Sequence, residues 1–421
     1  MRFKMIKNTV LLFLLGAISC ANLAERDLDE SSSLEVLPTV KGKNSSSRQA
    51  IIVGANNTKA YLPLLKGKTV GVVANQTSVI FKPKGATHLV DSLLELKINV
   101  KKVFAPEHGF RGQADAGEQI KDGLDRKTGL PLISLYGKNK KPTTEQLEDV
   151  EVMVFDIQDV GARFYTYISS LHYVMEACAE ENIPLLVLDR PNPNGHYIDG
   201  PVLEMAHKSF VGMHPVPIVH GLTIGEYAQM INGEGWLNDS LTCDLTVIPV
   251  DNYTHQTPYE LPITPSPNLP NAMSINLYPS LCLFEGTDIS IGRGTNLQFQ
   301  VIGSPHLKMK RYPFSFTPQS GPGAKFPKHE GELCHGLDLS TTRRLKALDL
   351  KWLLETYEAY KQQNIASQFF NSFFTKLAGT THLKEQIISG KTVDEIRASW
   401  QKDLSSYRNM RQTYLLYPEH L

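Results

Sequence analysis

One segment of the chain, Phe104–Gly112, gathers an acid, a base and a cation behind an apolar run. Glu107, His108 and Arg111 follow Val100–Phe104, whose apolar residues are typical of a buried strand. Parallel α/β sheets place their chemistry at the carboxyl ends of strands. A carboxylic acid in a cleft there could protonate a leaving group, so Glu107 is our leading catalytic candidate. Taken alone, the segment would also suit a tight turn in which Glu107 and His108 are solvated.

Two other apolar runs also end in clustered polar sequence. Val152–Phe155 precedes the letters DIQDVGARFYTY, and Leu185–Leu188 precedes DRPNPNG. The side chains in these two segments that could take part in a site are Asp156, Asp159, Arg163, Tyr165, Arg190 and Asn192. If the three strands belong to one parallel sheet, their carboxyl ends meet at one edge. The sequence therefore predicts a single site assembled from three strand ends.

The elements that must position these residues alternate along the first half of the chain. A helical pattern over Thr87–Leu96 lies between strand patterns at Thr69–Val73 and Val100–Phe104, and the alternation continues beyond them. Such alternation predicts a Rossmann-like α/β domain with a parallel sheet covered on both faces, which we place at residues 50–296. A smaller α+β domain is expected over residues 297–421.

Two local signals concern helix boundaries. Thr223 and Glu226 have the spacing of a capping box, so a helix is expected to begin at Thr223. Pro279 suits the first turn of a helix that ends near Gly286.

Known cofactor and nucleophile motifs are missing from the sequence. Residues 74–78, after the first strand, read ANQTS instead of a GxGxxG turn, and neither a P-loop nor a GxSxG elbow occurs. We therefore predict no cofactor. The four cysteines after Cys20 have no zinc spacing, so no metal is predicted. A metal-dependent hydrolase that uses His108, Asp156, Asp159 and His220 is an alternative without support from an HExxH pattern.

The N-terminus predicts export. Basic residues precede the apolar run Val10–Ala17, and small residues then precede Cys20, as in a lipoprotein-type signal over residues 1–20. Residues 21–49 are polar and serine-rich, which indicates a flexible tether. We expect a cell-envelope protein anchored to a membrane by a lipid on Cys20, facing the periplasm or the cell surface; simple secretion is the alternative. Lysine plus arginine and aspartate plus glutamate total 43 each, so nucleic acid is not expected as a partner.

From about residue 51 onward the sequence resembles the exo-β-N-acetylmuramidase family of glycoside hydrolases. Five motifs in order carry the resemblance: PEHG at 106–109, DIQDVGxRFYTY at 156–167, LDRPNP at 188–193, HGLTIGE at 220–226 and FEGTDISxGRGT at 284–295. The resemblance implies a Rossmann-like catalytic domain, a smaller C-terminal domain and a cleft between them. It also implies release of terminal N-acetylmuramic acid from the non-reducing end of peptidoglycan fragments, so peptidoglycan-derived saccharides are the expected partners.

Glycoside hydrolysis usually needs an acid and a second carboxylate. Glu107 is the expected acid, and His108 either orients it or makes a structural hydrogen bond. The second group is Asp156, Asp159 or Glu285, unless the substrate's own 2-acetamido carbonyl attacks and an aspartate only polarises it. The residues leave this choice open.

N-acetylmuramic acid carries a lactyl carboxylate, which a guanidinium could hold by two parallel hydrogen bonds. Arg163, Arg190 and Arg293 are the candidates, and structural ion pairs are the alternative for each. Tyr165 could stack on a sugar ring. Asn192 and Asn268 could bind sugar hydroxyls or serve as turn residues beside proline. The rival from outside enzymes is a non-catalytic lipoprotein that binds cell-wall glycans through the same cleft.

Overall fold

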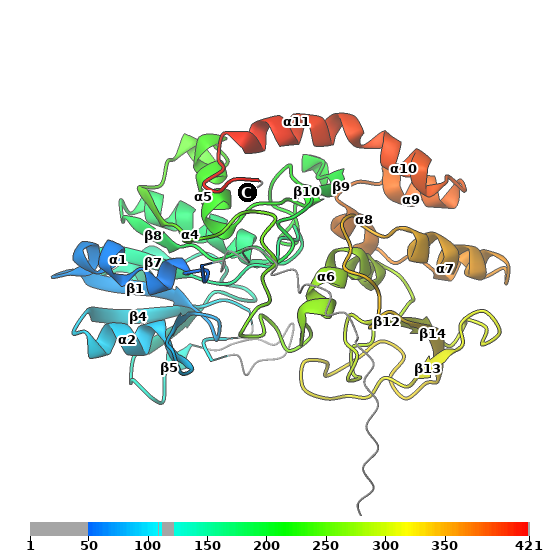
Figure 1. The fold of residues 1–421 in the computed structure, drawn as a ribbon, viewed down its shortest axis with the longest axis horizontal. Coiled ribbons are helices and arrows are strands. Elements are labelled where there is room, and N and C mark those ends of the chain that lie inside the picture. The colour runs from blue at the N-terminus through cyan, green and yellow to red at the C-terminus, as the bar shows by residue number, and fades with distance from the viewer. Residues whose placement is uncertain (1–48, 108, 112–121, 420–421) are drawn as a thin grey trace, which may run out of the picture. The chain divides into compact units, whose positions relative to one another are not determined.

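A seven-stranded, mainly parallel sheet forms the centre of the first half of the chain (Figure 1). In the computed structural model of this protein, the residues described are 49–107, 109–111 and 122–419. All neighbouring strands in the sheet are parallel except the edge pair β5 and β6. In their order across the sheet, the strands are β11 (Leu245–Ile248), β8 (Leu185–Leu188), β7 (Val152–Asp156), β1 (Thr69–Ala74), β4 (Asn99–Ala105), β6 (Pro131–Ser134) and β5 (Gly123–Leu124).

Helices cover both faces of this sheet because its central strands are apolar on both sides. Every residue of β7 and β8 is buried. The helices α1 (Thr58–Leu65) and α2 (Leu89–Glu95) pack on one face, whereas α4 (Tyr167–Glu180) and α5 (Ile224–Gly233) pack on the other. The predicted capping box is present at the start of α5, where Thr223 and Glu226 bond reciprocally. The predicted fold class is confirmed.

The second half of the chain contains a small antiparallel sheet and a series of helices. Its strands lie in the order β12 (Val301–Ser304), β14 (Cys334–Asp338) and β13 (Phe314–Phe316). The helices of this half are α6 (Ala272–Leu281), the 3-10 helix η4 (Cys282–Gly286), α7 (Lys351–Lys361), α8 (Phe373–Ala378), α9 (His382–Ile388), α10 (Val393–Ser399) and α11 (Gln401–Gln412). The remaining elements are α3 (Thr144–Leu147), the strand pairs β2 (Val79–Phe81) with β3 (Ala86–His88) and β9 (Asp199–Val202) with β10 (Pro217–Val219), and the short 3-10 helices at Gly54–Asn56, Met205–His207, Asn238–Ser240 and Ala366–Gln368.

The helix α6 differs from our prediction for Pro279. Asn271 caps the helix, so Pro279 lies in its last turn instead of its first. A proline there has no N–H to donate to the carbonyl four residues earlier, which belongs to Ile275. That carbonyl instead accepts a hydrogen bond from Asn194 Nδ2 at 3.0 Å. The proline thus frees an acceptor that joins α6 to the turn after β8.

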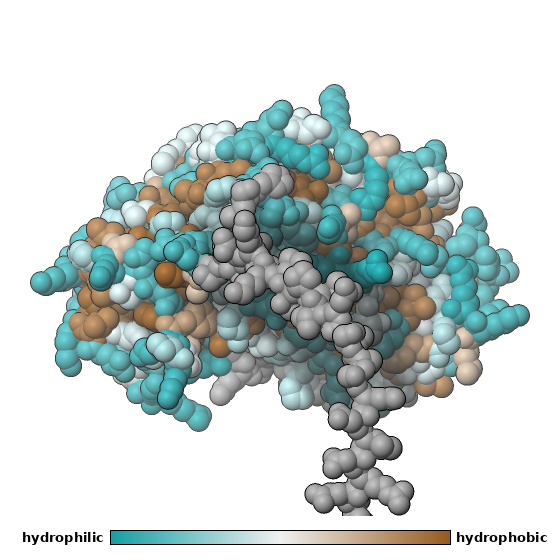
Figure 2. Space-filling model, viewed as in Figure 1, coloured by the Kyte–Doolittle hydropathy of each residue, from teal (hydrophilic) through white to brown (hydrophobic). Residues whose placement is uncertain are grey.

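From Gln49 onward the chain forms one compact unit. The predicted boundary near residue 296 lies inside this unit and stays a prediction. The face shown in Figure 2 carries interspersed hydrophilic and hydrophobic side chains. Among the described residues, no helix is both long enough and apolar enough to cross a bilayer.

Candidate active site

A cavity of about 580 Å³, called here the main cavity, lies where the carboxyl ends of the sheet strands meet the second half of the chain. Its volume falls within the range of roughly 300–1,000 Å³ that small-molecule sites occupy. Strand ends supply Glu107 and Tyr136, the loop before α4 supplies Phe164 and Thr166, and η4 supplies Glu285. Further lining residues from the second half are Tyr278, Cys282, Arg293, Lys325, Phe326 and Lys328.

A smaller hollow of about 70 Å³, called here the recess, adjoins the main cavity. The two hollows share Glu107, Phe164, Thr166, Tyr278 and Arg293. The residues that line only the recess are Tyr165, Tyr167, Ser266, Asn268, Leu269 and Phe299. Glu107 therefore faces both spaces, which is a suitable position for a group that acts on a bond between two parts of a ligand.

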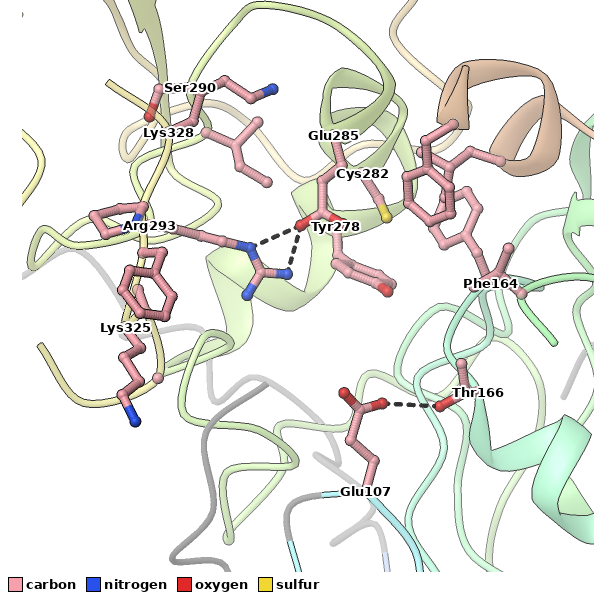
Figure 3. Close-up of a pocket in the computed structure, with 18 of the residues that line it drawn as sticks. Glu107, Phe164, Thr166, Tyr278, Cys282, Glu285, Ser290, Arg293, Lys325 and Lys328 are labelled. Atoms are coloured by element: carbon pink, nitrogen blue, oxygen red, sulfur yellow. Dashed lines mark hydrogen bonds and ion pairs between the residues drawn. The ribbon is translucent and has the colours of Figure 1, made fainter. Parts of the chain in front are cut away.

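Glu107 follows β4 by two residues and is held by neighbouring segments. Its carboxylate accepts a hydrogen bond from Thr166 Oγ1 at 3.2 Å (Figure 3). Its backbone carbonyl accepts one from the Tyr167 hydroxyl at 3.3 Å. Burial, the charge of Glu107 and a hydrogen bond to Glu107 together raise the pKa of Tyr136 above its ordinary value. His108, the second predicted catalytic residue, lies outside the described residues.

Glu285 and Arg293 form an ion pair on the other side of the main cavity from Glu107 (Figure 3). Arg293 Nε and Nη2 approach the same oxygen, Glu285 Oε1, at 2.7 and 2.5 Å. The guanidinium also lies over the ring of Phe299, with its carbon 5.0 Å from the ring centre. No described residue bonds Arg293 Nη1, so the pair leaves donors for a ligand.

The described charges around the main cavity favour an anion. Three cations, Arg293, Lys325 and Lys328, face two carboxylates, Glu107 and Glu285. Lys328 is held by backbone carbonyls, including those of Phe284 at 3.2 Å and Ile289 at 3.1 Å, and burial lowers its pKa to about 8. The excess positive charge is what a site for a sugar acid would need.

Asp156 and Arg190, both predicted for the site, pair with each other inside the core. Arg190 Nε and Nη2 donate to the two carboxylate oxygens of Asp156 at 2.6 and 2.9 Å, and Nη2 also donates to the carbonyl of Val79. Burial raises the pKa of Asp156 and the Arg190 charge opposes that shift. Neither residue lines the main cavity or the recess. Both residues lie at strand ends, as predicted, but their side chains bind each other and do not reach the main cavity or the recess.

Arg163 is also directed into the framework. It is fully buried, and its two terminal nitrogens donate to the carbonyls of Pro201, Val216, Leu377 and Ala378 at 2.7–2.9 Å. These four acceptors use both terminal nitrogens, so we leave Arg163 out of the proposed site.

Asp159 and Asn192 occupy buried turns. Asp159 accepts from the backbone N–H of Gly161 at 2.6 Å and lies 3.6 Å from His220. Asn192 donates to the carbonyl of Leu222 at 2.8 Å, and a Cβ on Gly161 would meet its amide at 2.3 Å. The close approach explains the glycine, and Asn192 Oδ1 also accepts from the backbone N–H of Asn194 at 2.8 Å, so both ends of the amide have structural partners. Neither Asp159 nor Asn192 lines a described hollow of the site.

The structure therefore assembles Glu107, Tyr165, Asn268, Glu285 and Arg293 from the predicted set. Sequence reasoning missed Tyr136, although this residue directly follows the apolar run LISL at 132–135 and the strand-end argument could have found it. Among the described residues, no group of histidine, cysteine and acidic side chains is arranged to hold a metal ion. Of the residues named for the metal-dependent alternative, Asp156 is bound to Arg190 and Asp159 lies 3.6 Å from His220, whereas His108 lies outside the described residues.

Comparison with known proteins identifies the class to which this fold and site belong. A model of the N-terminal domain of the exo-β-N-acetylmuramidase NamZ matches residues 70–273, and a model of the C-terminal domain matches residues 276–417. The chain belongs to the NamZ family of glycosidases, as the sequence motifs indicated.

Individual relatives agree with this assignment. The peptidoglycan β-N-acetylmuramidase NamZ of Bacillus subtilis strain 168 is 40% identical over 373 residues, which cover 85% of this chain and 89% of the relative. Two crystal structures of DUF1343 family proteins from Bacteroides fragilis NCTC 9343 are similar in fold. One has a TM-score of 0.81 at 48% identity and covers 88% of this chain and all of its own. The other has a TM-score of 0.75 at 30% identity and covers 87% of this chain and 99% of its own.

Proposed function

We propose that this protein releases terminal N-acetylmuramic acid from the non-reducing end of peptidoglycan fragments, with Glu107 as the general acid. The carrying observation is the position of Glu107 between the main cavity and the recess, where Thr166 holds its carboxylate. A carboxylic acid in this place can protonate the oxygen of the glycosidic bond as it breaks. The name of the Bacillus subtilis relative gives the matching substrate polymer.

Two groups compete for the second catalytic role. Glu285 is the other carboxylate among the described lining residues, and Arg293 holds it on the far side of the main cavity. The substrate's 2-acetamido carbonyl is the alternative. In either route, the excess positive charge from Arg293, Lys325 and Lys328 favours the lactyl carboxylate, and Arg293 Nη1 offers it hydrogen-bond donors.

The test is release of free N-acetylmuramic acid from β-linked N-acetylmuramyl-N-acetylglucosamine. We expect turnover by the wild type and a loss of about a hundredfold or more in Glu107→Gln, which keeps the shape and removes the acid. Glu148→Gln is the matched control, because Glu148 is an exposed glutamate that does not line the cavity. If the Glu107→Gln variant turns over the substrate as fast as the wild type, another residue must be the general acid. Binding of the disaccharide without turnover by the wild type would favour the glycan-binding alternative.

We also propose that a lipid on Cys20 anchors the protein in the cell envelope. The support is the signal-like sequence before Cys20 together with a relative whose name places its substrate in the cell wall. Residues 1–48 lie outside the described part of the chain. Mass spectrometry of the N-terminal peptide should find a diacylglyceryl group on Cys20, and Cys20→Ser should release the protein from the membrane fraction. An unmodified, cleaved N-terminus in the wild type would favour simple secretion.

A further inference from the structure

The recess beside Glu107 is the smaller of the two hollows at the site. Its volume is about 70 Å³, against about 580 Å³ for the main cavity. A substituent of a few heavy atoms would fill it. Polar and apolar groups share its walls, and the aromatic rings among them are Phe164, Tyr165, Tyr167, Tyr278 and Phe299.

Several polar side chains of the recess have partners within the protein. The Tyr165 hydroxyl donates to the carbonyl of Pro265 at 2.9 Å, and the Tyr167 hydroxyl donates to the carbonyl of Glu107 at 3.3 Å. Ser266 Oγ accepts from the backbone N–H of Asn268 at 3.2 Å. These groups fix the walls of the recess, and their bonds do not depend on a ligand.

Asn268 Oδ1 is the exception. The residue is only 2% exposed, and no described residue donates a hydrogen bond to this oxygen. The orientation of the amide is set because Nδ2 donates to the carbonyl of Gly323 at 2.7 Å. A buried acceptor without a donor is costly, and native structures rarely keep one without a reason. Asn268, which lines the recess, therefore carries a buried acceptor that has no donor among the described residues, and an N–H or O–H group of a ligand would satisfy it.

We propose that the recess receives the 2-acetamido group of the sugar on which Glu107 acts. The acetamido methyl lies against the aromatic rings, and the acetamido N–H donates to Asn268 Oδ1. The inference rests on the proposed function, because it assumes that a 2-acetamido sugar is bound beside Glu107. It assigns Asn268 as a residue that selects the substrate, since a sugar without the N–H would leave the acceptor unsatisfied.

The experiment compares two substrates that differ only in this donor. One is β-linked N-acetylmuramyl-N-acetylglucosamine, and the other carries a 2-O-acetyl ester in place of the 2-acetamido group of the muramyl unit. We measure kcat/KM on both and take their ratio, the acetamide preference. The wild type should show a preference of about a hundredfold or more. Asn268→Ala should lower the preference at least tenfold, mainly by slowing the acetamido substrate. Using the ratio removes any difference in intrinsic reactivity between ester and amide, because both proteins meet the same two substrates.

Gln76→Ala is the matched control. Gln76 is also an amide with an unpartnered, buried Oε1, and it holds the same segment through the carbonyls of Thr264 and Pro265, but it does not line the recess. Its acetamide preference should equal that of the wild type. An equal change in Gln76→Ala and Asn268→Ala would overturn the inference, as would an unchanged preference in Asn268→Ala.

A second variant guards against misfolding, and the wild-type result separates this inference from the proposed function. Asn268→Leu keeps the side-chain volume and removes the acceptor, so it should show the same loss of acetamide preference. It replaces Asn268→Ala if thermal unfolding shows that the alanine variant does not fold. A wild type that hydrolyses neither substrate contradicts the proposed function. A wild type that hydrolyses the acetamido substrate while the Asn268 variants keep its preference contradicts only the assignment of the recess.

Discussion

Thr166 Oγ1 donates a hydrogen bond to the carboxylate of Glu107 at 3.2 Å, and Thr166 is the residue immediately before α4. The bond links the end of β4 to the start of the helix that follows β7. The orientation of the candidate acid is therefore set by the end of β4 and the start of α4, with Tyr136 as a further partner from the end of β6.

This relationship predicts that Thr166→Val lowers kcat about tenfold while changing KM little. Valine keeps the shape and removes the donor, and one hydrogen bond to a charged group contributes about 1.5 kcal/mol or more. Thr144→Val is a suitable control, because Thr144 Oγ1 donates to Glu181 at an exposed position outside the cavity. A rise in KM with unchanged kcat would indicate that Thr166 contributes to binding and does not orient the acid.

Arg293→Lys should reduce the preference for a muramyl over a glucosaminyl substrate at least tenfold. Lysine keeps the charge but lacks the planar guanidinium that can hold Glu285 and a ligand carboxylate together. The measurement is kcat/KM on N-acetylmuramyl-N-acetylglucosamine and on N,N′-diacetylchitobiose. Arg311→Lys, at an exposed arginine packed on Tyr312, should leave the preference unchanged. If Arg293→Lys leaves the preference unaltered, the lysines of the cavity, and not Arg293, recognise the carboxylate.

The core ion pair should matter for stability more than for chemistry. Asp156→Ala leaves the Arg190 charge buried without its partner, and such a change costs about 3–5 kcal/mol in the free energy of unfolding. Urea unfolding measures the difference. Lys391→Ala, which breaks a half-exposed pair with Glu395, should cost less than about 1 kcal/mol. Equal losses in the two variants would contradict the framework role assigned to Asp156.

A buried histidine pair predicts lower stability in acid. His214 Nε2 lies 3.0 Å from His172 Nδ1, and burial lowers the pKa of His172 to about 4 and that of His214 well below its ordinary value. As the pH falls below about 6.5, the two histidines take up protons in the unfolded chain but stay neutral in the folded chain. The free energy of unfolding is therefore highest above pH 6.5 and decreases toward pH 4. The loss for His172 approaches about 3 kcal/mol. Urea unfolding between pH 7.5 and 4.5 should show it, and His172→Gln should show a weaker pH dependence; identical pH profiles would contradict the role of the pair.

An apolar run located the strand end that carries Glu107, whereas Glu285 and Arg293 belong to the FEGTDISxGRGT motif at 284–295. Glu107, Glu285 and Arg293 meet at one cavity, although nearly 180 residues separate the first from the second in the chain. The direction of each side chain could not be read in the same way. Asp156 and Arg190 also occupy strand ends, but two opposite charges that can reach each other in the core form their own pair.

The two asparagines beside proline also show that the contacts of a side chain cannot be read from the local sequence. Asn192 and Asn268 have similar local sequence, and both are buried. Asn192 finds both an acceptor and a donor among neighbouring backbone groups, whereas Asn268 finds only an acceptor. Distant carbonyls, those of Leu222 and Gly323, hold the two amide nitrogens. The Asn192 oxygen accepts from the N–H of Asn194 two residues later, whereas no described residue donates to the Asn268 oxygen.

The four carbonyls around Arg163 have a consequence for the order of synthesis. Pro201 and Val216 precede the point where the two family models divide, whereas Leu377 and Ala378 follow it by about a hundred residues. Until α8 has emerged from the ribosome, one terminal nitrogen of a buried guanidinium lacks both of its acceptors. The half with the seven-stranded sheet therefore cannot complete its packing around Arg163 before α8 has been made. A chain truncated between residues 273 and 276 should depend on chaperones or aggregate.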